Sequence, residues 1–320
     1  WIRSWRESGR RPRALSWTRE LAARFPVKSR QKLEIPGDEA DITVYLYEPE
    51  NRTGVTPLII NLHGGGFVKS YRGRDIILSQ NFAWHTGCLV ADVDYKTAPE
   101  KKYPYAQMEG YRVVEYFTST RSSTGSIRSG SSCPPERRRQ PDHRNRDALP
   151  AQGGAPGLPT DHGLPALDLY KDPMEKPFTE SEEEKKMAIN GRLYNDWYID
   201  EELRRESYAS PVYASEEELR GLPPVLLLTG GLDSLGEEAE RFTYQLIRAG
   251  VPVTAKRFLT AKHGFLARRN SEFVEAEKMI FDVIKQIKDG GGACKPVKAV
   301  KAKEKARGTL DKSRPMFPWL

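Results

Sequence analysis

Short apolar runs alternate with longer amphipathic stretches along most of the 320-residue chain. Residues 31–48 alternate polar and apolar positions around Gly37, which predicts a hairpin of two strands. Further strands are predicted where short runs of apolar or β-branched residues lie between turn-forming residues, at 57–62, 88–93, 224–229 and 253–258.

Apolar residues recur at helical spacing in 105–118, 236–249 and 271–287, and Gly250 closes the second of these segments. Strands that alternate with helices along a chain indicate an α/β fold, in which helices cover both faces of a mainly parallel sheet. We therefore expect one α/β domain over residues 31–289.

The net charge of +7 is concentrated in three segments of the chain. Residues 1–30 carry nine Lys and Arg against two Glu, residues 285–320 carry ten against three acids, and residues 121–150 carry seven against three. The rest is acidic and has no basic patch interleaved with aromatic residues, so we expect no nucleic-acid partner. Residues 290–320, rich in Gly, Lys and Ala, are expected to form a disordered basic tail.

The three cysteines, Cys88, Cys133 and Cys294, are scattered and suggest neither a disulfide framework nor a zinc site. We expect no metal and no cofactor.

No apolar run is long enough to span a membrane. The opening segment WIRSWRESGRRPR lacks the continuous apolar stretch of a secretory signal, so a cytoplasmic protein is expected. These patterns specify no oligomeric state.

Three consecutive glycines, Gly64-Gly65-Gly66, directly follow the predicted strand at 57–62. Glycines let the backbone turn tightly and aim its N–H groups at one point, which in acyl transfer is the developing oxyanion. A plain tight turn would leave the same pattern. Asp233 and His263 also follow predicted strands, and alone they fit a helix N-cap and an ordinary histidine. Together, Asp before His is the chain order of α/β-hydrolases.

With these residues, the chain resembles the hormone-sensitive-lipase family of esterases, also called α/β-hydrolase fold-3. The resemblance covers roughly 40–118 and 166–288. It implies an α/β-hydrolase fold with a small helical cap and a small hydrophobic ester as substrate. The segments that carry it are HGGGF at 63–67, VDYKTAPEKKYP at 93–104, SPVYAS at 210–215, LPPVLLLTGGLDSLGEEAE at 222–240 and AGVPVTAKRFLTAKHGF at 249–265.

The resemblance also implies roles for single residues. Gly64 and Gly65 would donate N–H groups to the oxyanion, Asp233 would be the acid of a catalytic triad, and His263 its base. Residues 175–209 would form the cap together with residues 1–30, although a surface amphipathic helix would account for 1–30 equally well. The VDYKTAPE segment would shape the loop beneath the site.

The nucleophile expected from the resemblance is missing. The family carries its serine in a Gly-Asp-Ser-Ala-Gly-Gly-Asn-Leu elbow, which this chain lacks. Residues 119–165, where the elbow belongs, have no hydrophobic periodicity and would ordinarily indicate a disordered insertion. The nearest in-frame match centres on Ser132, but Pro134 stands where the elbow needs glycine. Ser132 is therefore a poor candidate.

A shift of reading frame offers another explanation for this segment. With CGN arginine codons, residues 136–147 read one nucleotide later permit Ser-Ala-Gly-Gly-Asn-Leu followed by apolar residues. The same shift over 161–166 permits Ile-Met-Val-Tyr-Pro, an apolar strand that runs into Ala166. Two matches in one frame lead to the hypothesis that about 136–165 is an out-of-frame translation. The chain as printed would then lack the nucleophile and a central strand.

Two alternative functions stay open, and the second of them uses the same residues. The chain could be a non-catalytic member of the fold that binds a small hydrophobic ligand, or an amidase or deacetylase. The presence of both Asp233 and His263 favours an enzyme, because a pure binder has no use for the pair. The resulting prediction is a carboxylic ester hydrolase by family, whose chain as printed is weakly active or inactive.

Overall fold

The computed structural model describes residues 20–54, 56–124, 166–177 and 182–289. The main elements of this part of the chain are, in order, β1 (Val27–Ile35), β2 (Ile42–Pro49), β3 (Leu58–Leu62), α3 (Gly73–Thr86), β4 (Leu89–Asp94), α4 (Tyr105–Thr124), α5 (Glu182–Tyr198), α6 (Glu216–Leu219), β5 (Val225–Leu232), α7 (Gly236–Arg248), β6 (Val253–Lys262), α8 (Phe265–Arg268) and α9 (Phe273–Lys288). None of these helices is long and apolar enough to cross a membrane.

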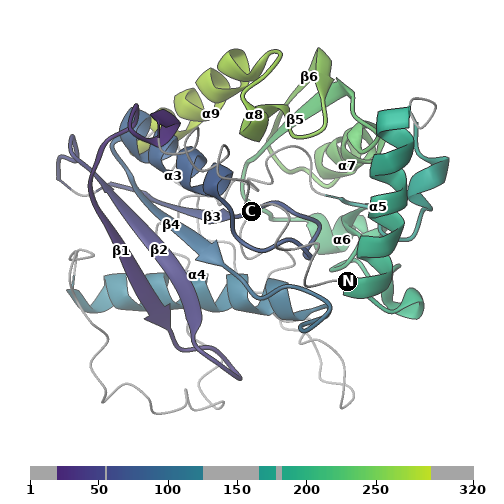
Figure 1. The fold of residues 1–320 in the computed structure, drawn as a ribbon, viewed down its shortest axis with the longest axis horizontal. Helices are drawn as coiled ribbons and strands as arrows, with labels where there is room; N and C mark the ends of the chain where they lie inside the picture. The colour runs from purple at the N-terminus through teal and green to yellow at the C-terminus, as the bar shows by residue number, and fades with distance from the viewer. Residues whose placement is uncertain (1–19, 55, 125–165, 178–181, 290–320) are drawn as a thin grey trace.

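The described strands form two sheets (Figure 1). The first has the order β1-β2-β4-β3, and the second pairs β5 with β6. The predicted hairpin is confirmed, since β1 and β2 pair antiparallel with Ile35 opposite Ile42. The pairs β3–β4 and β5–β6 are parallel, whereas β2–β4 is antiparallel, so the first sheet is mixed.

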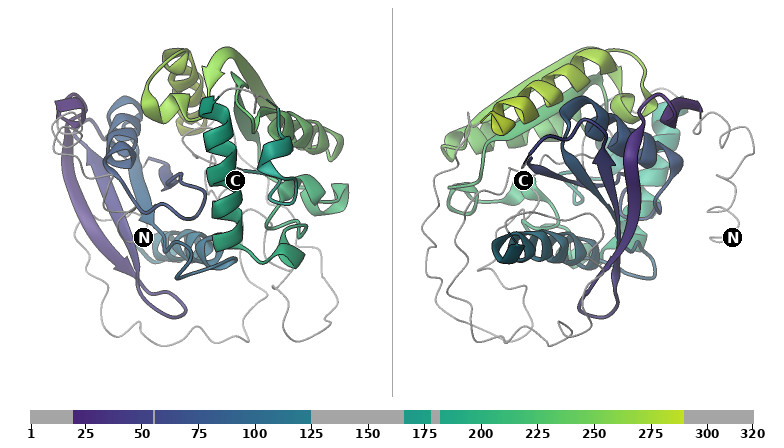
Figure 2. Two further views of the ribbon diagram at one scale, coloured as in Figure 1. Left: turned by 45° about the vertical axis from the view of Figure 1, so that its right-hand side comes forward. Right: turned by 90° about the vertical axis from the view of Figure 1, so that its left-hand side faces the viewer.

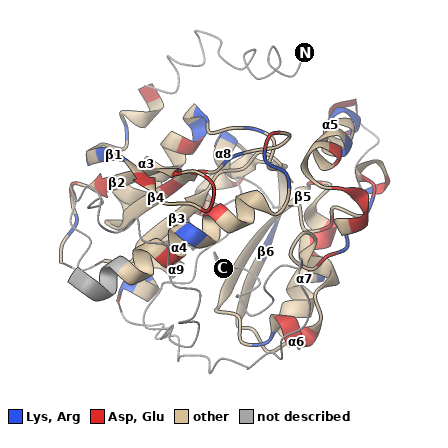
Figure 3. Cartoon of the chain, turned by 90° about the horizontal axis from the view of Figure 1, so that it is seen from below, with Lys and Arg blue, Asp and Glu red and all other residues tan. Residues whose placement is uncertain are grey.

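Helices cover both faces of the first sheet. Neighbouring residues of a strand point to opposite sides, and here apolar side chains on both sides are buried against helices. Tyr47 of β2 and Val90 of β4 pack with α3 and α9 on one face. Leu46 and Ala91, one residue away on each strand, pack with α4 on the other face. Charged residues are frequent along α5 and α6 (Figure 3).

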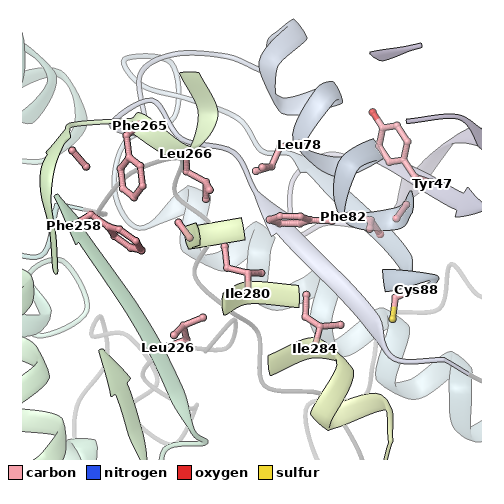
Figure 4. Close-up of a cluster of buried hydrophobic side chains, with 14 residues drawn as sticks. Tyr47, Leu78, Phe82, Cys88, Leu226, Phe258, Phe265, Leu266, Ile280 and Ile284 are labelled. Carbon is pink, nitrogen blue, oxygen red and sulfur yellow. The ribbon is translucent and has the colours of Figure 1, made fainter. Parts of the chain in front are cut away.

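One hydrophobic cluster joins the two sheets, and we call it the bridging cluster (Figure 4). Phe82 of α3 and Ile280 of α9 lie in it, in contact with residues from β2, β4, β5, β6 and α8. Figure 2 shows α3 and α9 lying side by side along one face of the molecule. Each large side chain buried in this way contributes roughly 1.5–3 kcal/mol.

Two details differ from the sequence expectation. Helix α3 was not expected, because its buried positions include polar residues such as Ser79 and Asn81, which obscure its apolar stripe. Helix α4 continues to Thr124, six residues into the segment without periodicity. The remaining residues of that segment, 125–165, lie outside the described part of the chain, as does the predicted tail from 290 onward.

Replacing Ile280 should show how strongly the bridging cluster stabilises the fold. Ile280 is 4% exposed, so Ile280→Ala should lower the free energy of unfolding by about 2–5 kcal/mol, measured by urea denaturation. Val274 lies on the same helix and is 65% exposed, so Val274→Ala is the matched control and should change it by less than about 0.5 kcal/mol. Equal effects of the two substitutions would contradict this role.

Candidate active site

The glycine loop after β3 adopts a conformation that only glycine accepts readily. Gly65 has φ of 145° and Gly66 has φ of 60°, and Phe67 follows at 57°. The carbonyl of Gly65 accepts hydrogen bonds from the backbone N–H groups of Val68 (3.3 Å) and Lys69 (3.1 Å). The loop is therefore a closed turn whose shape is fixed by its own backbone.

Side chains from two other segments hold this turn in place. The buried ring of His63 stacks on Tyr95 with 4.1 Å between centroids, and the Tyr95 hydroxyl donates to the His63 carbonyl at 2.6 Å. The guanidinium of Arg72 donates to the Gly64 carbonyl at 2.6 Å. Tyr95 belongs to the VDYKTAPE segment, so the expectation that this segment shapes the loop agrees with its contacts.

Asp233 reaches its position through an irregularity in β5. The register with β6 shifts between Gly230 and Leu232, which re-aims the residues that follow. A Cβ atom on Gly230 would lie 2.7 Å from the Ala261 carbonyl oxygen, and one on Gly231 would lie 2.6 Å from the carbonyl oxygen of the neighbouring Leu259. The two glycines thus allow the end of β5 to approach β6 very closely.

Asp233 and His263 meet at the ends of these strands. The distance from Nδ1 of His263 to Oδ2 of Asp233 is 3.1 Å, and Oδ1 accepts a hydrogen bond from the backbone N–H of Leu235 at 3.0 Å. The Asp233 side chain is buried, whereas that of His263 is 32% exposed. The carboxylate therefore serves both the local turn and the imidazole. The N-cap interpretation is wrong, because the N-cap of α7 is Leu235, which has no side-chain cap, and Asp233 bonds the turn before the helix.

The imidazole faces a cavity of about 330 Å³. Its walls come from the glycine loop, the segment 166–169, helix α5 and the turn around His263. Gly65 and Gly66 lie in the wall, whereas Gly64 does not. The structure thus brings Gly65 and His263 to one cavity, with Asp233 directly behind the imidazole.

Helix α5 contributes a residue that sequence reasoning missed. Glu184 lies in the cavity wall and is 7% exposed. Burial raises the pKa of its carboxyl, and the nearby charge of Asp233 raises it further. Its neighbour Glu183 pairs with Lys262 at 2.9 Å, directly before His263. No sequence motif marks Glu184, because its site depends on how α5 packs over the strand ends.

A buried ion pair fixes the wall segment 166–169. Nζ of Lys176 lies 2.5 Å from Oε2 of Glu238 and donates to the Asp168 carbonyl at 2.9 Å. Oε1 of Glu238 accepts from the backbone N–H of Leu167 at 2.7 Å. Both charged side chains are almost completely buried, so they stabilise each other by pairing rather than through water.

Several predicted features lie wholly or partly outside the described residues. Ser132, the candidate nucleophile, lies outside the described residues, and so does the proposed out-of-frame stretch at 136–165. Of the proposed N-terminal cap over 1–30, only 20–30 are described, and 27–30 belong to β1 of the first sheet rather than to a cap. Of 175–209, all but 178–181 are described.

The sequence matches the model of a family described as alpha/beta hydrolase fold, over residues 59–133 and 163–267. The matched parts contain the glycine loop, Asp233 and His263. This chain belongs to the α/β-hydrolase fold-3 family. The resemblance inferred from the motifs is confirmed, and the family is one of carboxylesterase-type hydrolases.

The chain is similar to several proteins named as esterases. An arylesterase of Saccharolobus solfataricus is 24% identical in an alignment of 262 positions, which covers 75% of this chain and 78% of that protein. The carboxylic ester hydrolase LipN of Mycobacterium tuberculosis is 28% identical over 73% of this chain, which spans only 63% of the length of LipN. An esterase structure from Pyrobaculum calidifontis has a TM-score of 0.70 at 23% identity, covers 89% of this chain and 93% of its own, and shows a shared fold.

The conformation of Gly65 predicts a specific cost for a side chain there. A Cβ atom would lie 2.7 Å from Cβ of Lys69, and the backbone conformation alone disfavours Gly65→Ala by about 1–3 kcal/mol. Gly54 also has positive φ, of 65°, but open space around it, so Gly54→Ala is the control and should cost only about 1–2 kcal/mol. Urea unfolding of both variants measures the difference. A smaller loss for Gly65→Ala than for Gly54→Ala would refute the prediction.

Asp92, which lies in β4 opposite Asn61 of β3, predicts a pH dependence of stability. It accepts hydrogen bonds from Asn61 (2.8 Å), Ser79 (2.7 Å) and Tyr71 (2.9 Å), yet complete burial raises its pKa from 3.8 to about 7. Between pH 4 and 7, Asp92 therefore binds a proton more readily in the folded chain than in the unfolded chain, and its contribution to stability should fall as the pH rises through this range.

Urea midpoints at pH 5, 6, 7 and 8 test this dependence. Asp92→Asn should flatten the decline between pH 5 and 7, because the titrating group is gone. The control Asp282→Asn, on the exposed side of α9, should leave the decline as it is. An unchanged slope in Asp92→Asn would show that other groups cause it.

Proposed function

We propose that the intended product of this gene is a serine carboxylesterase that acts through Asp233 and His263. The observation that carries the proposal is the 3.1 Å contact between these side chains, with the imidazole in the wall of the cavity that Gly65 also lines. The pairing of a buried carboxylate with a partly exposed imidazole suits a base that must reach a substrate.

In the proposed mechanism, the oxygen of a serine hydroxyl attacks the acyl carbon of the ester, and His263 takes the proton of that hydroxyl. The backbone N–H groups of Gly64 and Gly65 stabilise the oxyanion that forms. His263 then gives the proton to the leaving alcohol. In the second half of the reaction, His263 takes a proton from a water molecule as it attacks the acyl-serine, and returns that proton to the serine oxygen as the acid leaves. Asp233 keeps the imidazole in the right tautomer and stabilises its positive charge. Helix α5, as part of a cap, would select the acyl group and exclude water.

We further propose that the serine is encoded in the shifted frame and that the printed chain lacks it. Two observations support this. The family match stops at residue 133 and resumes at 163, so its gap lies almost wholly within the proposed out-of-frame stretch of about 136–165. In addition, the described strands of this α/β-hydrolase fall into two sheets that do not pair with each other.

Sequencing the transcript and assaying both versions of the protein tests the proposal. A transcript with an intact frame for the printed residues would refute the frame shift. The restored chain is the protein in which about 136–165 are replaced by the residues that the shifted frame encodes, and it should hydrolyse p-nitrophenyl acetate. Replacing its new serine by Ala should lower kcat by about 10⁴-fold or more, and so should His263→Ala. Asp233→Asn should lower kcat by a similar order, because the imidazole loses its orienting partner.

The printed chain should be no faster than the restored chain carrying His263→Ala. Robust turnover by the printed chain that His263→Ala abolishes would contradict the missing nucleophile and point to Ser132. A fluorophosphonate probe gives an independent measurement, because it should label the restored chain and leave the printed chain unlabelled.

A further inference from the structure

Helix α5 lies along the cavity from the imidazole to the glycine loop. Its residues in the cavity wall include a set spaced three or four positions apart, as on one face of a helix: Glu184, Met187, Gly191, Tyr194 and Tyr198. Near the start of α5, Glu183 pairs with Lys262, which directly precedes His263. Near its end, Tyr194 and Tyr198 contact the glycine loop. The two ends of the helix therefore mark two ends of the cavity.

Two tyrosines close the space between α5 and the glycine loop. The ring of Tyr194 lies so near Gly66 that a Cβ atom on this glycine would be 3.0 Å from Cδ2 of the ring. One turn further along α5, Tyr198 stacks on Phe67 with 4.3 Å between ring centroids. Not even a methyl group fits between Gly66 and Tyr194 unless one of them shifts. A substrate chain therefore has no passage between the loop and the helix at this point.

Lys69 ties the ring of Tyr194 to the same turn. Its ammonium group lies 5.0 Å from the ring centroid, within the range of a cation–π contact, and its backbone N–H donates to the Gly65 carbonyl at 3.1 Å. Tyr194 is partly exposed, whereas Tyr198 is 1% exposed and belongs to the core. Of the two tyrosines, Tyr194 is thus the one that can be replaced without opening the core.

The proposed mechanism sets the direction in which an ester lies in the cavity. His263 gives its proton to the leaving alcohol, so the alcohol oxygen faces the imidazole. The carbonyl oxygen faces the N–H groups of Gly64 and Gly65. The acyl chain is the remaining substituent of the carbonyl carbon, so it extends away from His263 and toward Tyr194. Since consecutive Cα atoms are about 3.8 Å apart, the ring stands within about 8 Å of the Cα atom of Gly65.

The composition of the wall agrees with this direction. Around His263 the wall holds charged side chains, those of Glu184, Lys262 and Arg268. At the other end, Phe67, Leu169, Tyr194 and Tyr198 line the cavity and pack in one hydrophobic cluster. An apolar acyl chain is better accommodated among these aromatic and aliphatic side chains than among the charged ones.

We propose that Tyr194 is a specificity-determining residue, whose ring closes the acyl end of the cavity and sets the longest acyl chain that the site accepts. The direction of the ester rests on the proposed esterase function, whereas the closure of the cavity does not. Binding to the printed chain and turnover by the restored chain therefore test the two proposals separately.

Binding is measured by calorimetry on the printed chain with methyl butanoate and methyl octanoate. The printed chain should bind both about equally, because the extra methylene groups of the octanoate find no room beyond Tyr194. In Tyr194→Ala, methyl octanoate should bind about 10- to 100-fold more tightly than methyl butanoate, since each buried methylene group increases affinity about 4-fold. Tyr194→Phe keeps the ring and should keep the equal affinities.

Two further variants control this measurement. Tyr244→Ala removes a ring that is 62% exposed on α7 and should leave the two affinities equal. Tyr194→Leu keeps an apolar side chain against the glycine loop and should give a smaller gain than Tyr194→Ala, so the test does not depend on how well the alanine variant folds. Urea midpoints of all variants show whether each is folded.

Turnover by the restored chain is compared for p-nitrophenyl butanoate and p-nitrophenyl octanoate. Tyr194→Ala should raise the ratio of kcat/KM for the octanoate to that for the butanoate by the same 10- to 100-fold, about the gain expected for binding. Tighter binding of the octanoate to the printed chain than of the butanoate, or an equal change in Tyr194→Ala and Tyr244→Ala, would overturn the role of Tyr194.

The two proposals can fail independently. A gain in octanoate binding in Tyr194→Ala, with no turnover of either ester by the restored chain, would refute the esterase function and support the closure by Tyr194. Turnover by the restored chain with the same chain-length ratio before and after Tyr194→Ala would support the esterase function and refute the closure.

Discussion

The packing of α3 and α9 between the two sheets is the interaction on which the candidate site depends. The glycine loop belongs to the first sheet, and Asp233 and His263 belong to the second. No strand pairing joins β3 to β5 in the described part of the chain, so hydrogen bonds between strands do not set the distance between the two halves of the site. The bridging cluster sets it instead, through close packing of side chains such as Phe82 and Ile280.

Polar contacts then fix the segments that line the candidate site, after apolar packing has brought the two sheets together. Tyr95 and Arg72 each donate to a carbonyl of the His63–Gly64 segment, which fixes the glycine loop from two sides. On the other side of the cavity, Lys176 and Glu238 fix the wall segment 166–169. These contacts keep the backbone around the cavity from shifting. That matters in a catalytic site, because transition-state stabilisation depends on hydrogen-bond donors that are already in position.

Much of the fold could be predicted from the sequence because strand patterns are local. The alternation around Gly37 and the apolar runs at 57–62 and 224–229 are confirmed as β1–β2, β3 and β5. Asp233 and His263 were identifiable because a motif and its chain order carry the information, and the structure brings them together.

Other features depend on contacts between distant segments and left no pattern in the sequence. Helix α3 packs against several partners, and its buried polar residues hide its apolar stripe. Glu184 becomes part of the cavity wall only because α5 lies over the strand ends.

The glycine pair in β5 has a consequence for how this site can change over evolutionary time. Gly230 and Gly231 leave no room for a Cβ atom against the backbone of β6, so the distance between Asp233 and His263 is set by two main chains in contact. Side chains around the pair can therefore drift without disturbing it, and selection on the cavity can proceed independently of selection on the acid–base pair. A chain that has lost its nucleophile would keep an intact Asp–His pair for the same reason, as an architectural remnant of the close approach of the two strands.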